Sequence, residues 1–182
     1  MKIVSRLTCI LLIVFLTGCS SLNEPSLKVK DATVNIRTVE KDISVHSSDG
    51  QEESYSSVYL SYHFGIKNTG FKAIEEIEVK IEPGPELAEL STKMFGINIF
   101  DKFERERAGF GIAFSGAPKL TRKEEEVYQL DYNLGVLEQS NRFPVAPSTV
   151  ELEYLLASAS DATLIVTVKD KELGRVKLDE RN

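Results

Sequence analysis

Few residues of this 182-residue chain could support catalysis or metal binding, because it has only two histidines and two cysteines. His46 lies in a polar stretch with Asp49, Glu52 and Glu53. Imidazole and carboxylate groups are normal ligands of divalent cations, so this stretch could bind a metal. The residues follow no fixed ligand spacing, and a solvated loop is the preferred interpretation. His63 is expected on the polar face of a strand, in a surface or cross-strand role.

Neighbouring glutamates could in principle supply paired carboxylates for acid–base catalysis. They are Glu75 with Glu76, Glu124 to Glu126, and Glu151 with Glu153. In an acidic chain, glutamates on strands and turns are usually solvated side chains, and we favour that interpretation here.

Three glycines, Gly109, Gly111 and Gly116, resemble a phosphate-binding loop only in composition. Such a loop needs a strand, a glycine turn and then a helix N-terminus. These glycines alternate within a predicted strand, and Pro118 follows. The chain also has no G-x-S-x-G or H-E-x-x-H motif. We therefore expect a protein that is not an enzyme and that holds no cofactor or metal.

The N-terminal segment has the composition of an export signal. Lys2 and Arg6 supply positive charge, and Leu7–Phe15 is almost wholly apolar. Small residues, Thr17 and Gly18, then precede a cysteine, which is typical of a cleavage site. The apolar run is shorter than the roughly 20 residues that span a bilayer.

The sequence Leu16-Thr17-Gly18-Cys19 resembles the lipobox of bacterial lipoproteins. The resemblance implies that the Cys19 thiol receives a diacylglyceryl group and that cleavage makes Cys19 the first mature residue. Residues 1–18 would be the signal peptide, 19–26 the lipidated cysteine and tether, and 27–182 a β-sandwich domain. Two or more acyl chains anchor a protein stably, whereas one holds only marginally.

The charge of the chain limits its partners. The net charge is −6, and loss of Lys2 and Arg6 with the signal would leave 20 cations against 28 acidic residues. An acidic surface argues against a nucleic-acid partner, and membrane contact is expected through the lipid on Cys19. Because Cys9 and Cys19 both precede residue 27, the folded domain would contain no thiol and no disulfide.

Alternating apolar residues predict several strands. The clearest is 58–67, where Val58, Leu60, Tyr62, Phe64 and Ile66 share one face. Further strands are predicted at 27–39, 77–81, 108–117, 127–134, 162–168 and 173–178. The turn residues Asn68 to Gly70 suggest that strands 58–67 and 77–81 pair with each other. Residues 40–57, apart from a possible brief strand at Ile43 and Val45, are expected to form an exposed loop.

A helix and an apolar patch complete the prediction. Ser148 and Glu151 match a capping box, which predicts one short helix from Thr149 to about Ala157. Val150, Tyr154 and Leu155 are expected to share a face of this helix. The patch comprises Met94, Phe95, Ile97, Ile99, Phe100 and Phe103. We expect it to be buried, and the alternative is a docking surface.

The run "YLSYHFGIKNTG" followed by "IEEIEVKIE" resembles the strand, turn and strand of immunoglobulin-like modules in bacterial envelope proteins. One-sided strands of this kind belong to antiparallel sheets. The sequence therefore predicts a mainly β fold, a single antiparallel immunoglobulin-like β-sandwich with one short helix near the C-terminus.

Together these features predict a lipoprotein of the bacterial cell envelope, anchored to the membrane and facing outside the cytoplasm. It would be a non-enzymatic module that binds another envelope protein or a surface component through loops such as 40–57 or 102–107. The alternative is an envelope module that binds a small molecule or a divalent metal.

Overall fold

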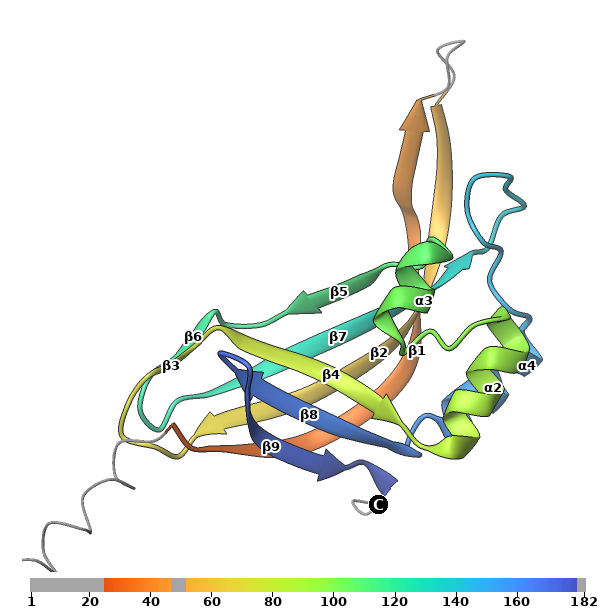
Figure 1. Cartoon of the computed structure of the whole chain (residues 1–182). Coiled ribbons are helices and arrows are strands. Elements are labelled where there is room, and N and C mark those ends of the chain that lie inside the picture. Colours follow the sequence, from red (N-terminus) through yellow and green to blue (C-terminus); the bar gives the residue numbers. More distant parts are fainter. Residues whose placement is uncertain (1–24, 47–51, 180–182) are drawn as a thin grey trace, which may run out of the picture.

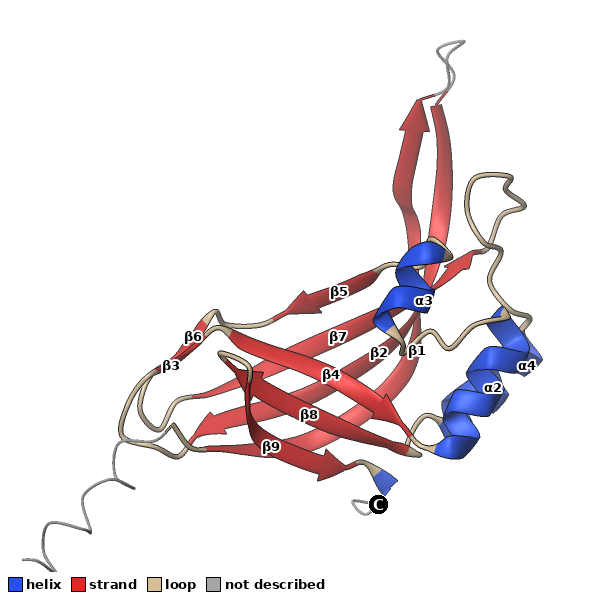
Figure 2. Ribbon diagram, in the orientation of Figure 1, coloured by secondary structure: helices blue, strands red, loops and turns tan. Residues whose placement is uncertain are grey.

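A computed structural model describes residues 25–46 and 52–179 of the chain, and the fold is mainly β with antiparallel sheets (Figures 1 and 2). The strands are β1 (Leu27–His46), β2 (Glu52–Asn68), β3 (Ile74–Glu75), β4 (Ile77–Pro83), β5 (Ile112–Ser115), β6 (Lys119–Leu120), β7 (Glu125–Val136), β8 (Ala162–Val168) and β9 (Lys171–Lys177). The helices are α2 (Pro85–Phe95), α3 (Lys102–Arg107) and α4 (Thr149–Ser158). The predicted β-sandwich class is confirmed.

Two sheets form the two layers of the sandwich (Figure 2). The larger has the strand order β1-β2-β7-β5, and the smaller has the order β4-β8-β9. The short pair β3-β6 lies at one end of the molecule (Figure 1). Every pairing between these strands is antiparallel.

The core lies between the sheets and is built from the predicted alternating residues. Leu60 and Ile66 of β2 are fully buried, as are Leu130 and Leu134 of β7. Leu164 of β8 packs in the same cluster from the opposite sheet. Burial of such side chains contributes roughly 1.5–3 kcal/mol each, so the alternation fixes which face of each strand turns inward.

The predicted pairing of strands 58–67 and 77–81 is wrong. β4 pairs with β8 in the smaller sheet, whereas β2 lies between β1 and β7. The buried Asn68 explains the change of sheet, because its side-chain amide donates to the carbonyls of Lys72 and Leu120 at 2.7 and 3.1 Å. These bonds hold a crossing connection in place of a tight hairpin turn.

The prediction that residues 40–57 are mostly an exposed loop is also wrong. β1 and β2 continue past the sheet as a paired ladder that ends at His46 opposite Glu52. We call Ile43–His46 and Glu52–Tyr55 the hairpin arm, which projects from the sandwich in Figure 1. A bulge with Lys41 at φ 51° precedes it, and Asp42 there accepts hydrogen bonds from Ser57 and Tyr59. The sequence pattern missed the arm because its residues are mainly polar.

The C-terminal helix is confirmed as α4, with both hydrogen bonds of the predicted capping box. Its predicted apolar face is wrong in part, since Leu155 is buried but Val150 and Tyr154 are exposed. The structure adds two helices to the one predicted, α2 and α3. α2 begins at Pro85 and ends at Phe95, and Gly96 follows with a φ of 71° that suits a left-handed C-cap.

The predicted strand 108–117 is shorter in the structure. Gly109 has φ 81° and belongs to the turn after α3, and only Ile112–Ser115 pairs with β7. All four residues of β5 are exposed because β5 is an edge strand of the larger sheet.

Candidate functional site

A groove lies between α2 and α4 among the described residues. α2 is fixed at its start by the carboxylate of Asp161, which accepts from the backbone amides of Glu86 and Leu87 at 3.1 and 3.4 Å. Gly84 must precede it, because a Cβ there would meet the Asp161 carboxyl group at 2.1 to 2.3 Å. The connection to β8 thus positions the first turn of α2.

The second wall of the groove, α4, is fixed by its own N-terminus. The Glu151 carboxylate accepts from the Ser148 backbone amide at 2.9 Å, and the Ser148 hydroxyl donates to it at 2.7 Å. These hydrogen bonds lower the pKa of Glu151 and keep it charged near the positive end of the helix. Ser148 and Glu151 therefore cap the helix, and Glu151 is not a candidate general acid.

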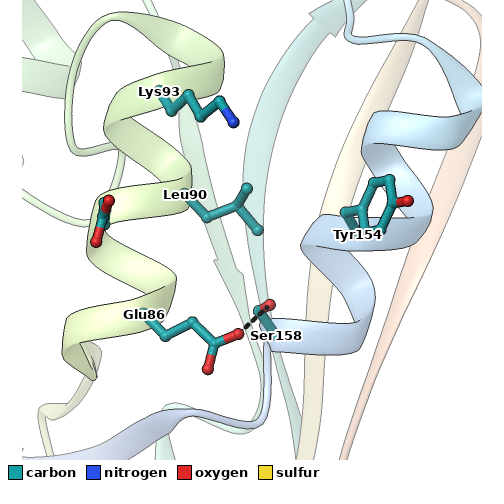
Figure 3. A pocket seen from close by; sticks show the side chains of 6 residues that line it. Glu86, Leu90, Lys93, Tyr154 and Ser158 are labelled. Atoms are coloured by element: carbon teal, nitrogen blue, oxygen red, sulfur yellow. Dashed lines mark hydrogen bonds between the residues drawn. The ribbon is translucent and has the colours of Figure 1, made fainter.

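The groove has a volume of about 440 Å³ and is lined by two kinds of side chain. Leu90 and Tyr154 supply apolar surface from the two helices (Figure 3). Glu86 and Lys93 lie at opposite ends of the α2 wall, and the Ser158 hydroxyl donates to Glu86 at 3.5 Å (Figure 3). Glu89 completes the lining.

This combination can bind an amphipathic segment, with an apolar group against Leu90 and Tyr154 and polar groups at the charged ends. Tyr154 is 65% exposed, so its ring is available to a ligand. An aromatic side chain held on a rigid helix contributes large contact area at low entropic cost. The lining contains no histidine or cysteine.

Sequence reasoning missed this groove. Its lining residues come from positions 86–93 and 154–158, and only the fold brings them together. One signal was present, since Val150 and Tyr154 are too far around the helix from Leu155 for all three to be buried on a narrow face.

The proposed metal-binding stretch around His46 is part of the hairpin arm. His46 is exposed and pairs with Glu52 in the strand register, while Asp49 lies outside the described residues. Glu53 accepts a hydrogen bond from the Tyr55 hydroxyl at 2.6 Å. In residues 25–46 and 52–179, no cluster of three or more His, Cys, Asp or Glu side chains is arranged to hold a metal ion.

Several glutamates of the acidic runs form ion pairs or local hydrogen bonds. Lys119 lies 2.7 Å from Glu75, and its hydrogen bond and charge lower the pKa of that carboxyl. Lys30 donates to both oxygens of Glu125 and lowers its pKa. The backbone amide and the hydroxyl of Thr121 both donate to Oε2 of Glu124 and lower the pKa of that carboxyl. Lowered pKa values keep these groups ionised, which is opposite to the shift that a general acid needs.

His63 lies on the outer face of the larger sheet, opposite Gln129 in the register. It borders a depression of about 420 Å³ that also includes Asp31, Glu125 and Glu126. No hydrogen bond or ion pair joins His63 to these carboxylates in the described part of the chain. His63 is half-buried on this face, which confirms its predicted position on the polar face of the strand, while its surface or cross-strand role stays a prediction.

The apolar patch is divided by the fold. Ile99 and Phe100 are buried, and Phe95 stacks edge-on against Phe110 with ring centroids 5.6 Å apart. Met94 and Ile97 are partly buried against the core. Phe103, at 81% exposed, is the exception to the expected burial.

Comparisons with known proteins give no relative for this chain: no family model, no curated protein and no solved structure matches it. No helix among the described residues is long and apolar enough to cross a membrane. Cys19, the predicted lipidation site, lies outside the described residues.

Proposed function

We propose that this protein is a lipid-anchored protein of the bacterial cell envelope that acts as a non-enzymatic binding module. The observation that carries the proposal is the position of Leu27, the first residue of β1, relative to the candidate binding surfaces. Cys19 precedes Leu27 by eight residues, which span at most about 28 Å when extended. An acyl group on Cys19 would hold this end of the sandwich near the membrane.

The candidate binding surfaces lie at the other end. Figure 1 places the start of β1 beside the β3-β6 end, and the α2–α4 groove and the hairpin arm at the opposite end. A protein anchored through Cys19 would therefore present the groove and the arm away from the bilayer. This arrangement supports a role in binding a partner that lies outside the membrane.

The anchor is tested by Cys19→Ala. We expect the variant to leave the membrane fraction and to keep the thermal stability of the wild type, because the change lies outside the sandwich. Cys9→Ala is the matched control, since it removes a thiol from the apolar run and leaves Leu16 to Cys19 intact. A Cys19→Ala protein that still sediments with membranes after a high-salt wash would refute the anchor.

The binding role is tested by photo-crosslinking on intact cells. A photoreactive amino acid at Tyr154 samples the groove, and one at Phe71 samples the opposite end, where the side chain is 56% exposed. We expect one reproducible protein adduct from position 154 and none of that mass from position 71. The same adducts from both positions would count against a specific distal surface.

The volume of the groove favours a second candidate function, the binding of a small molecule. Its 440 Å³ falls in the range of ligand sites in proteins. A ligand that binds only the folded protein raises its melting temperature by mass action. A thermal-shift screen of the wild type against Tyr154→Ala tests this candidate, because a groove ligand stabilises the first and not the second.

A further inference from the structure

β5 is a short, open sheet edge that contains no charged residue, proline or bulge. Natural edge strands carry charges, prolines or bulges that discourage pairing with another chain. β4 has Glu78, Lys80 and Glu82, and β9 also has four charged residues. β5 has the sequence Ile-Ala-Phe-Ser, which contains no charge and no proline.

The hydrogen bonds to β7 determine which backbone groups of β5 face outward. The Asn133 amide donates to the Gly111 carbonyl at 3.0 Å, in the register that pairs Ala113 with Asp131. Backbone groups in an antiparallel ladder alternate between the two sides of a strand. The amides and carbonyls of Ile112 and Phe114 therefore face away from β7, and no described strand pairs with them.

The side chains at this edge are also incompletely covered. Ile112 is 44% and Phe114 is 42% exposed. The Phe114 ring stacks on Tyr128 with centroids 5.7 Å apart, so it continues the apolar face of the larger sheet. A strand added beside β5 would cover both side chains.

We propose that β5 pairs with β5 of a second copy of this chain, antiparallel and about a twofold axis at Ala113. Ile112 would then form hydrogen-bonded pairs with Phe114 of the second copy, and the two Ala113 residues would face each other in a non-hydrogen-bonded pair. Four main-chain hydrogen bonds result, and the larger sheets of the two copies join into one.

Charge and shape favour a second copy of this chain as the partner that pairs with the edge of β5. The chain has a net charge of −6, so most of its faces repel a second copy, whereas β5 brings no charge to the contact. The edge is self-complementary, because the antiparallel arrangement puts Ile112 against Phe114 twice. Ala113 is small enough for the close approach of a non-hydrogen-bonded pair, about 4.5 Å between Cα atoms.

The contact is small. A four-residue ladder covers less than the roughly 1,200 Å² of a stable interface, so we expect weak association in dilute solution. Confinement to a membrane surface raises the effective concentration and favours the pair. This strengthening rests on the proposed lipid anchor, whereas the pairing itself depends on β5 alone.

Cysteine cross-linking tests the register. Ala113→Cys puts two thiols opposite each other at the twofold axis, within the Cβ separation of about 3.5–4.5 Å that a disulfide accepts. Ser115→Cys is the matched control, since it lies on the same face of β5 but four residues from its counterpart in this register. We expect oxidation of the full-length chain to give a disulfide dimer roughly ten times faster at 113 than at 115.

The wild type, treated in the same way, measures any disulfide through Cys9 or Cys19. Adding Ile112→Pro to Ala113→Cys removes one outward amide and should abolish the dimer, since an edge strand accepts proline where its amide faces solvent. Equal rates at 113 and 115, or attachment of position 113 to a different polypeptide, would overturn the pairing. If the Ala113→Cys protein fails to form the dimer but still fractionates with membranes, the proposed lipid anchor is retained and only the pairing is rejected.

Discussion

At the residue scale, Asn68 links three segments of the fold. It is fully buried, and its side-chain oxygen accepts from the Gly70 amide at 2.9 Å while its side-chain nitrogen donates to two carbonyls. Its backbone amide also donates to the Glu124 carbonyl. One amide side chain thus joins the end of β2 to the connection before β3 and to Leu120 of β6.

Asn68→Ala is therefore expected to lower the free energy of unfolding by about 2–4 kcal/mol, because it leaves buried donors and acceptors without partners. Urea denaturation measures the change. Asn141→Ala is the matched control, since Asn141 is exposed and its loss should change stability by less than about 0.5 kcal/mol. Equal effects from the two substitutions would contradict the structural role of Asn68.

Tyr132 is expected to make the free energy of unfolding depend on pH in the alkaline range. Burial raises its pKa to about 12, whereas an unfolded tyrosine titrates near 10. The folded state therefore keeps a proton that the unfolded state releases between these values. The stabilisation from this group is complete below pH 10 and is lost as the pH rises to 12, by up to about 2–3 kcal/mol.

Tyr132→Phe should remove this contribution, so its stability should fall less steeply between pH 10 and 12 than that of the wild type. The cost at neutral pH is small, because the hydroxyl accepts only one long hydrogen bond, 3.4 Å from the Ile81 amide. Thermal melts at several pH values between 10 and 12 measure how steeply stability falls with pH. Tyr154→Phe, at an exposed tyrosine, should keep the wild-type slope.

At the element scale, Asp161 connects the folding of α2 to the start of β8. Its carboxylate accepts from two amides of the first helical turn, and its backbone carbonyl accepts from the Gly84 amide at 2.7 Å. Gly84 has no side chain to cap α2, so the cap comes from a distant segment. One wall of the groove thus depends on a contact across 75 positions of sequence.

Asp161→Ala is expected to lower the free energy of unfolding by about 1 kcal/mol and to loosen α2 at its N-terminus. Hydrogen exchange should show faster exchange of the amides of Glu86 and Leu87 and little change in β2 or β7. Glu89→Ala, an exposed change on the same helix, is the control. Unchanged exchange at residues 86–87 would mean that α2 needs no external cap.

Some elements of the fold can be predicted from the sequence, and others cannot. Strands β2 and β7 follow from alternation, because their inner faces are buried and apolar. The hairpin arm does not, since its residues are mainly polar and make polar contacts: the Tyr55 hydroxyl donates to Glu53 at 2.6 Å. The partner of β4 and the groove depend on contacts between distant positions, which local periodicity does not encode.

At the scale of the whole molecule, the hairpin arm lies outside the hydrophobic core. The arm residues Ile43–His46 and Glu52–Ser54 contribute nothing to the buried core cluster, whereas Tyr55 is 8% exposed and packs edge-on against Phe143. An isolated two-stranded hairpin is only marginally stable in water. Under the proposed function, the arm is a second surface for contact with the partner.

Replacing residues 44–54 with Asn-Gly joins Ile43 to Tyr55, which already face each other in the register, through a two-residue turn. We expect the shortened protein to unfold within about 1 kcal/mol of the wild type, because the core is unchanged. We also expect it to lose the protein adduct that a photoreactive amino acid at position 154 forms on intact cells. A control that replaces only Ser44 and Ser54 with alanine keeps the length of the arm and should keep the adduct. A shortened protein that melts normally and still forms the adduct would restrict partner binding to the α2–α4 groove.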